Sequence, residues 1–276
     1  MGARVLGNVS FLTDYGLDDE FVGVCKAVML GIEPTLSIID VTHGIAPHDV
    51  RAGALALARS AQYLPEGVLL AVVDPGVGSG RRAVAVEVGR GFLVGPDNGL
   101  LAPAVAMLGG ARSAVELTNA DFQVPSPGST FAGRDIFAPA AAHLASGTEI
   151  ERLGSRIDPL SLVPGLLPLS SVDDGRLSCE VLWEDRFGNL QLNVDPGELD
   201  QLGMPLGATV AAMVGSSRWV VRRVASYVEG GQREPILVVD SYGLASLAVA
   251  SGSASELLAA HVGTAVVLCP SEEGTT

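Results

Sequence analysis

The stretch GVLLAVVDPGVGS, residues 67–79, sets an unbroken apolar run directly before a glycine-rich turn. An apolar run without polar alternation is typical of a strand that is buried on both faces. Strands of this kind occur in sheets that helices cover on both sides. The stretch therefore predicts one strand of an α/β layer, with Asp74 at the strand's carboxyl end.

Segments with strand-like and helix-like spacing alternate on both sides of this stretch. The predicted strands cover residues 4–12, 36–43, 83–88, 92–95 and 113–117. The predicted helices cover residues 18–29, 49–62, 99–108 and 136–146. Alternation of this kind favours a mostly parallel sheet with helices on both faces. We therefore expect residues 1–165 to form an α/β domain whose sheet is mostly parallel.

The composition changes near residue 155. Residues 157–169 contain three prolines and no regular spacing, as expected of a crossing between domains. Beyond them, short β-type runs cover residues 177–185, 189–194, 208–214, 217–226, 235–241 and 264–269. Such runs, separated by glycine-rich turns, are typical of a small barrel or sandwich. We expect residues 166–276 to form a smaller, all-β domain with a barrel-like fold.

Composition narrows the classes of ligand. The 276 residues carry 17 Lys and Arg against 31 Asp and Glu, a net charge of −14, which opposes binding to the phosphate backbone of nucleic acids. No run approaches the roughly 18 apolar residues that a membrane helix needs. Cys25, Cys179 and Cys269 are widely separated, which indicates neither a disulfide framework nor a zinc site. We expect a cytoplasmic protein that binds small molecules, with no nucleic-acid or membrane partner.

A cluster of carboxylates follows the first predicted strand. Asp14 lies at the carboxyl end of that strand, where open α/β sheets place their ligands, and a carboxylate there can accept both hydroxyls of a ribose. Asp18 or Asp19 is expected to cap the helix that follows. The stretch also resembles, in part, the acidic amino-terminal motif of nucleoside hydrolases, which binds calcium and the ribose diol. Calcium-dependent nucleoside hydrolysis is therefore one alternative.

Further motifs each allow a structural interpretation. Asp74 and Arg81 are seven residues apart across a flexible turn, which suits either an ion pair that braces the turn or a catalytic pair. Asp135 or Thr130 suits the cap of the following helix. The runs DRFGN, residues 185–189, and DSYG, residues 240–243, suit hairpin turns. Taken singly, none of these motifs is specific.

The motifs gain specificity from their order along the chain. They are TDYG (13–16), DVTHGIAPHDV (40–50), DPGVGSGRR (74–82), GPDNGLL (95–101), TFAGRD (130–135), DRFGN (185–189) and DSYG (240–243). This ordered set, which covers most of the chain, resembles the S-adenosyl-L-methionine (SAM) hydrolases, also called SAM hydroxide adenosyltransferases. The SAM-dependent fluorinase and chlorinase are related enzymes.

The resemblance implies a fold, an assembly and a set of substrate contacts. Members of that family join an α/β domain to a β-barrel, and a homotrimer builds each active site between the first domain of one subunit and the second domain of its neighbour. Carried over by motif, Asp14 would hold the ribose hydroxyls and Asn98 would line the same pocket. In the second domain, Asp185, Asn189 and Ser241 would hold adenine and methionine, and Phe187 would supply an apolar wall.

The resemblance also implies the chemistry. Water or hydroxide attacks C5′ of the SAM ribose, methionine leaves and adenosine forms, with SAM as the substrate and neither a metal nor a separate cofactor. Asp74 and Arg81 match two of the three residues that surround the attacking water in that family. A carboxylate at position 74 would repel the halide of a halogenase, which favours water or hydroxide as the nucleophile.

Ala132 departs from the family motif, in which a histidine stands at this position. Three explanations stay open: Asp74 and Arg81 support hydrolysis without the histidine, the protein binds SAM or adenosine without turnover, or the histidine was replaced by alanine to trap a ligand. The histidines elsewhere in the chain are expected to serve packing or to face solvent: His43, His48, His143 and His261.

Overall fold

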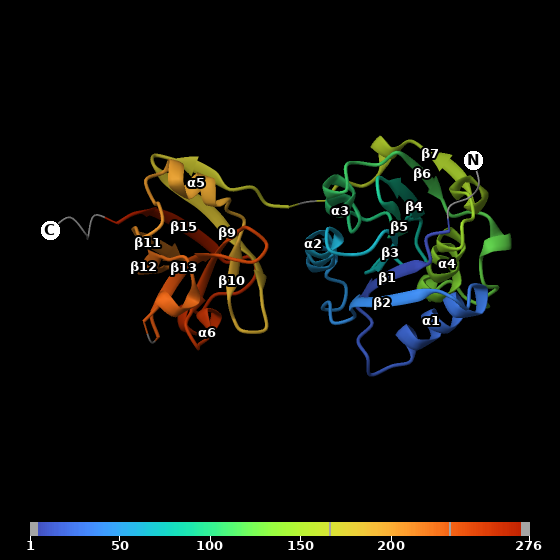
Figure 1. Cartoon of the computed structure of the whole chain (residues 1–276), viewed down its shortest axis with the longest axis horizontal. Helices are drawn as coiled ribbons and strands as arrows, with labels where there is room; N and C mark the ends of the chain where they lie inside the picture. Colours follow the sequence, from blue (N-terminus) through green and yellow to red (C-terminus); the bar gives the residue numbers. More distant parts are fainter. Residues whose placement is uncertain (1–4, 166, 232, 272–276) are drawn as a thin grey trace. The chain divides into compact units, whose positions relative to one another are not determined.

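A computed structural model describes residues 5–165, 167–231 and 233–271 of the chain (Figure 1). The chain divides into two compact units, residues 1–166 and residues 167–276. Each unit buries hydrophobic residues of its own. Among the described residues, no helix has the length and apolarity required to cross a membrane.

In the first unit, helices cover both faces of a single sheet (Figure 1). The strands are β1 (Asn8–Thr13), β2 (Ser37–Thr42), β3 (Gly67–Val72), β4 (Ala83–Val88), β5 (Gly91–Pro96), β6 (Ser113–Glu116) and β7 (Ser155–Ile157). The helices are α1 (Phe21–Ile32), α2 (Val50–Ala61), α3 (Ala102–Met107) and α4 (Ala138–Ala145). α1 and α4 pack on one face of the sheet, and α2 and α3 pack on the other.

The side chains of β3 divide between these two layers. Val68, Leu70 and Val72 face the core that contains α1 and α4, whereas Leu69 and Ala71 face the core that contains α2 and α3. All six residues of the strand are buried. The prediction of a strand covered on both faces is confirmed.

The sheet is mixed, with the strand order β2-β1-β3-β5-β4-β6-β7. β1 pairs in parallel with β2 and β3, and β3 pairs in parallel with β5. β4 pairs antiparallel with β5 and β6, and β6 pairs antiparallel with β7. The prediction of a mostly parallel sheet is therefore not confirmed. Residues 89–90, which join β4 to β5, are too few for the crossover that parallel neighbours need.

The parallel half of the sheet positions the candidate site. Thr13, the last residue of β1, is in register with Val72, the last residue of β3. Asp14 follows Thr13 directly, and Asp74 lies two residues beyond Val72. Because the carboxyl ends of parallel strands share one edge of a sheet, both carboxylates emerge at that edge.

The second unit is a closed β-barrel (Figure 1). Its strands are β8 (Ser171–Asp173), β9 (Arg176–Glu184), β10 (Leu190–Leu192), β11 (Thr209–Val214), β12 (Ser217–Arg223), β13 (Pro235–Val239), β14 (Ala245–Val249) and β15 (Ala265–Pro270). Its helices are α5 (Pro196–Gln201) and α6 (Ala254–Leu258). The ring runs β10-β14-β13-β12-β11-β15-β9 and closes where β9 pairs with β10, while β8 extends β9 outside the ring. The barrel-like prediction is confirmed.

β14 completes this ring, although the sequence patterns do not reveal it as a strand. Its residues, ASLAV, are all buried, so the strand has no polar alternation. Alanine and serine also favour strands only weakly. The pairing of β14 with β13 and β10 therefore depends on its neighbours more than on its own sequence.

Candidate active site

A pocket of about 780 Å³ opens in the first unit where the parallel strands end. The turn after β1, the loop before α2, the turn after β3 and the segment before α4 all contribute to its wall. The lining includes Asp14, Tyr15, His48, Asp74 and Ala132. The structure thus brings Asp14, Asp74 and position 132 together in one pocket.

Asp14 is held by the loop before α2. Its Oδ2 accepts a hydrogen bond of 2.8 Å from the backbone N–H of His48. His48 has a φ of +69°, a conformation uncommon outside glycine. The next residue, Asp49, caps α2 by accepting from the N–H of Ala52 at 2.8 Å. The start of α2 therefore fixes the backbone group that holds Asp14.

A chain of hydrogen bonds, which begins at the partly exposed Lys26 and Asp40, supports the turn after β1. The two ring nitrogens of His43 lie 2.8 Å from Thr13 Oγ1 and 3.1 Å from Asp40 Oδ1, and Lys26 Nζ donates to Asp40 Oδ2 at 2.6 Å. Thr13 Oγ1 also accepts from the N–H of Tyr15 at 3.2 Å.

The same chain sets the charge of Asp40. Burial opposes its ionisation, but the hydrogen bonds from Lys26 and His43 outweigh burial and lower the pKa of the carboxyl. Sequence reasoning assigned only packing or a surface position to His43 and overlooked this role. The signal available was its place at the end of a predicted strand, beside the candidate site.

Asp74 and Arg81 form a bidentate ion pair. Arg81 Nε donates to Asp74 Oδ1 at 2.8 Å and to Oδ2 at 3.0 Å, and Arg81 Nη2 also donates to Oδ2. The side chains are 6% exposed for Asp74 and 14% exposed for Arg81. The guanidinium lies 5.1 Å from the centre of the Phe137 ring, a distance that suits a cation–π contact. Asp74 lines the pocket with Arg81 behind it, so one ion pair braces the turn and also borders the pocket.

Asn98 does not line the pocket, but its side chain holds the backbone beside it. Its Nδ2 donates to the Val73 carbonyl at 2.9 Å, and its Oδ1 accepts from the N–H of Leu100 at 3.2 Å. The described residues that line the pocket do not include Asn98, so the structure does not bring its side chain together with Asp14. Asn98 instead holds the backbone immediately before Asp74.

The segment before α4 contributes small residues to the wall. Ala132 is 6% exposed, and Gly133 begins a π-helical turn. A Cβ atom built on Gly133 would lie 2.1 Å from the Tyr15 hydroxyl oxygen. Only glycine therefore fits at position 133 with Tyr15 in this orientation.

The predicted helix caps near this pocket are wrong. α1 begins directly after Glu20, which makes no side-chain cap, and Asp18 and Asp19 lie further before the helix. Asp135 lies within the π-helical turn and accepts from Arg134 Nε at 2.6 Å. Within the described ranges, no group of three or more His, Cys, Asp and Glu side chains is arranged to hold a metal ion.

A pocket of about 290 Å³ lies between two hairpin turns of the second unit. The β9–β10 turn contributes Asp185, Phe187 and Asn189, and the β13–β14 turn contributes Ser241 and Tyr242. The structure therefore brings together Asp185, Asn189 and Ser241, which the family motifs assign to adenine and methionine, and Phe187, which they assign to an apolar wall. The Phe187 side chain stands out from its turn and is 76% exposed.

The two turns share one construction. Asp185 Oδ1 accepts from the backbone N–H groups two and four residues later, at 2.8 and 2.9 Å, and Asp240 Oδ1 does the same at 2.8 and 3.2 Å. Each turn then presents an aromatic residue, Phe187 or Tyr242, at its third position. Asn189 Nδ2 donates to Asp185 Oδ2 at 2.8 Å. Asp185 and Asn189 thus shape the turn on which Phe187 stands.

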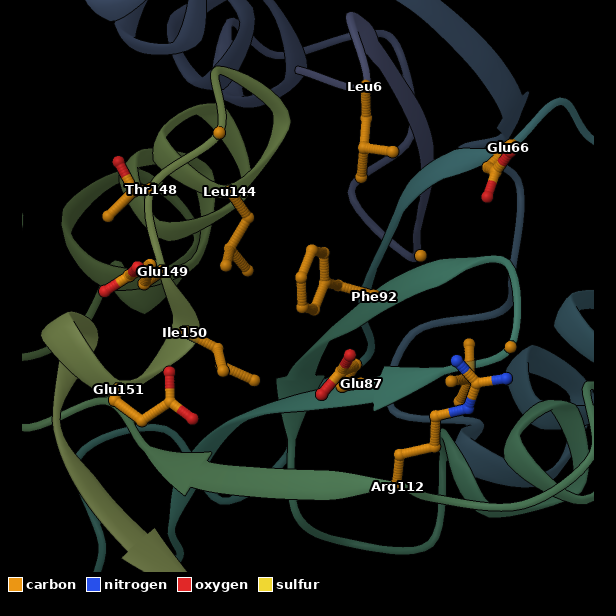
Figure 2. Close-up of a pocket in the computed structure, with 14 residues that line it drawn as sticks. Leu6, Glu66, Glu87, Phe92, Arg112, Leu144, Thr148, Glu149, Ile150 and Glu151 are labelled. Carbon is orange, nitrogen blue, oxygen red and sulfur yellow. The ribbon is translucent and has the colours of Figure 1, made fainter. Parts of the chain in front are cut away.

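Another pocket of the first unit, of about 340 Å³, lies at the opposite edge of the sheet, where β3 and β5 begin (Figure 2). Phe92, Leu144 and Ile150 form its apolar side, and the carboxylates of Glu87 and Glu149 lie around them. None of the residues singled out in the sequence lines this pocket.

Comparison with known proteins places the chain in a family. The family models for the SAM hydroxide adenosyltransferase N-terminal and C-terminal domains match residues 9–154 and 179–267. The chain is 46% identical over 250 residues to the (R)-S-adenosyl-L-methionine hydrolase of Salinispora tropica. The aligned residues cover 91% of this chain and 93% of that protein. It is 42% identical over 268 residues to the protein of the same name from Thermus thermophilus, with 94% and 98% covered.

A solved structure agrees with this relationship. The crystal structure of an uncharacterized conserved protein from Thermotoga maritima matches with a TM-score of 0.88 and 33% identity, over 95% of this chain and 99% of that chain. The N-terminal family model matches within the first unit, and the C-terminal family model matches within the second unit. The chain therefore belongs to the SAM hydroxide adenosyltransferase family.

Proposed function

We propose that this protein hydrolyses S-adenosyl-L-methionine to adenosine and L-methionine, by attack of water or hydroxide on C5′ of the ribose. The observation that carries the proposal is the single pocket that Asp14 and Asp74 share at the ends of neighbouring parallel strands, in a chain of this family. One carboxylate suits the ribose hydroxyls, and the other suits the attacking water.

The leaving group makes a small polar site sufficient. When the C5′–S bond breaks, the sulfonium takes the electron pair and leaves as the neutral thioether of methionine, so no leaving anion needs stabilisation. The site must instead hold the water in line with that bond and accept its proton. Asp74 orients the water and accepts the proton. The positive charge of the Arg81 guanidinium favours the hydroxide character of the oxygen.

The remaining residues bind the substrate in this proposal. Asp14 holds the ribose hydroxyls, and Asn98 shapes the same site through the backbone before Asp74. The barrel unit supplies the contacts to adenine and methionine, which are Asp185, Phe187, Asn189 and Ser241.

The assembly and setting of the enzyme also belong to the proposal. We place the enzyme in the cytoplasm as a homotrimer in which the barrel of a neighbouring protomer completes each site, with SAM as substrate and no cofactor. Analytical ultracentrifugation should then give a mass of about 85 kDa, three times the 28.3 kDa of one chain. A monomer at catalytic concentration would contradict this assembly.

The names of the relatives specify one configuration at sulfur, and we propose the same preference here. In a mixture of the two sulfonium epimers, the R epimer should disappear while the S epimer persists. Chromatography of the residual SAM measures this directly. Consumption of both epimers at equal rates would contradict the preference and leave the hydrolysis intact.

The central test is incubation with SAM followed by chromatographic measurement of adenosine and methionine, which should form in equal amounts. Asp74→Ala and Arg81→Ala should lower turnover more than they lower the affinity for adenosine measured by calorimetry. Binding of SAM without adenosine above a buffer blank would indicate an inactive binding protein. Release of ribose from adenosine, abolished by a chelator, would indicate a calcium-dependent nucleoside hydrolase.

A further inference from the structure

We propose that the Tyr15 hydroxyl is a further catalytic group, which accepts a hydrogen bond from the attacking water and, together with Asp74, aims the water's lone pair at C5′. This inference rests on the proposed SAM hydrolysis. Tyr15 belongs to the first of the ordered motifs, TDYG, but the proposed function gives it no role.

The first observation is the rigid placement of the phenol. The Tyr15 ring makes T-shaped contacts with the rings of Phe21 and Phe131, with centroid distances of 5.8 Å each. The Phe21 and Phe131 rings also make a T-shaped contact, with their centroids 5.2 Å apart. The backbone N–H of Tyr15 donates to Thr13 Oγ1 at 3.2 Å. A three-ring cluster and the turn after β1 thus hold the phenol in one orientation, which catalytic positioning requires.

The second observation is where the hydroxyl lies. It rests against the backbone of Gly133, because a Cβ atom built on Gly133 would lie 2.1 Å from the hydroxyl oxygen. Tyr15, Ala132 and Asp74 line the same pocket. The hydroxyl therefore occupies space that a side chain at position 133 would otherwise fill.

The third observation is the unmet hydrogen-bonding capacity of this group. In the part of the chain that the structure describes, no protein atom forms a hydrogen bond with the Tyr15 hydroxyl. Polar groups at the wall of a pocket normally find a partner, so a water or a substrate atom completes this one. The attacking water is the partner that the proposed reaction supplies.

The charge state of the phenol agrees with this role. Burial, followed by the nearby Cys25, Asp14 and Asp74, raises the pKa of Tyr15 well above its ordinary value of 10.0, and Arg81 opposes the change only in part. The phenol therefore stays neutral at physiological pH.

The step balances without ionising the phenol. One O–H of the water donates to the Asp74 carboxylate and the other donates to the Tyr15 oxygen. As the C5′–O bond forms and the C5′–S bond breaks, the first proton passes to Asp74 and sulfur takes the electron pair. Tyr15 is a neutral hydrogen-bond partner before and after the step.

The test compares Tyr15→Phe with wild type in steady-state SAM hydrolysis, with Tyr63→Phe as the matched control because Tyr63 is 69% exposed and does not line the pocket. Loss of one hydrogen bond in the transition state should lower kcat about tenfold. KM should change less than about twofold, since uniform substrate binding is retained. Thermal denaturation of Tyr15→Phe should match wild type, and Tyr63→Phe should keep full activity.

A second variant tests the geometry. Gly133→Ala places a methyl group where the hydroxyl lies, so it should also lower kcat, and in the Tyr15→Phe background it should lower kcat much less than in wild type. A wild-type kcat for Tyr15→Phe, or equal effects of Gly133→Ala in both backgrounds, would overturn the role of Tyr15 and leave SAM hydrolysis standing. A wild-type protein that releases no adenosine would overturn the proposed function and this inference together.

Discussion

At the residue scale, the Asp74 carboxylate serves two purposes. It neutralises a guanidinium that has little access to solvent, and it forms part of a pocket wall. A buried charge that loses its partner is costly, because the remaining group is neither solvated nor paired. The Asp74–Arg81 ion pair therefore contributes both to the stability of the fold and to the proposed reaction.

Asp74→Asn should separate charge from shape at this position. The amide keeps the size of the side chain but leaves the Arg81 charge without its counter-ion, so the free energy of unfolding should fall by about 2 kcal/mol. Proton acceptance is also lost, so kcat should fall at least about a hundredfold. Urea denaturation and SAM kinetics measure the two effects.

The control for this variant is Glu151→Gln. Glu151 pairs with Arg156 in an exposed position, with side chains 42% and 74% accessible. Loss of an exposed ion pair should cost less than about 1 kcal/mol. Equal losses for Asp74→Asn and Glu151→Gln would show that burial of the Asp74 pair contributes nothing.

At the element scale, the hairpin between β9 and β10 depends on a close approach of its backbone to α6. Gly188 has a φ of +77°, and its carbonyl accepts from the N–H of Ser255 at 2.9 Å. A Cβ atom at position 188 would lie 2.2 Å from Ser253 Oγ and 2.7 Å from Ser253 Cβ. The turn that carries Phe187 thus needs glycine for both conformation and space.

Gly188→Ala should therefore destabilise the barrel by about 3 kcal/mol, since overpacking adds to backbone strain. Gly175→Ala is the matched control, because Gly175 has a φ of +71° but no atom within 4 Å of an added Cβ. Strain alone should cost about 1 kcal/mol there. Both tryptophans, Trp183 and Trp219, lie in the second unit, so fluorescence in urea reports its unfolding. Equal losses would exclude the clash with Ser253.

Helix α4 should give the first unit a pH dependence. Burial, followed by the charge of Arg152, lowers the pKa of His143 below its ordinary value of 6.5. The unfolded chain then binds the proton more tightly than the folded chain, so the contribution of His143 is complete above about pH 6.5 and declines as the pH falls. His143→Gln should show a smaller loss of stability between pH 7 and pH 5 in urea titrations. An unchanged pH dependence would exclude His143 as its source.

At the scale of the whole molecule, each unit has the parts of an independently folding domain. The first buries a helix-covered sheet and the second buries the interior of a closed barrel. Under the proposed function, however, the substrate contacts are divided between the two units. We therefore expect each unit to fold without the other, whereas activity requires both units.

Fragments 1–166 and 167–276 should each unfold cooperatively when expressed alone, because each retains its own core. Far-UV circular dichroism during heating measures both, and tryptophan fluorescence measures the second alone. Neither fragment should release adenosine from SAM. A fragment that lacks a cooperative transition would show that its fold requires the other unit, and turnover by fragment 1–166 would show that the barrel residues are dispensable.

The sequence by itself determined most of the long strands and helices and their order along the chain. The apolar run at 67–73 predicts a doubly buried strand because burial on both faces removes the polar alternation. The sequence also places Asp14 and Asp74 each at the carboxyl end of a predicted strand, where open α/β sheets bind ligands. Glycine-rich turns between short β-type runs likewise predict a barrel-like second half. The ordered motifs resemble the family to which the chain belongs.

Only the tertiary structure decided which distant groups meet. The mixed pairing of β4 and the closure of the barrel by β14 depend on neighbouring strands, whose identity local spacing does not encode. The chain from Lys26 to Thr13 and the contact of Tyr15 with Gly133 join residues on separate elements. Periodicity and turn chemistry are properties of neighbours along the chain, whereas packing and hydrogen bonding across the fold are set by three-dimensional proximity.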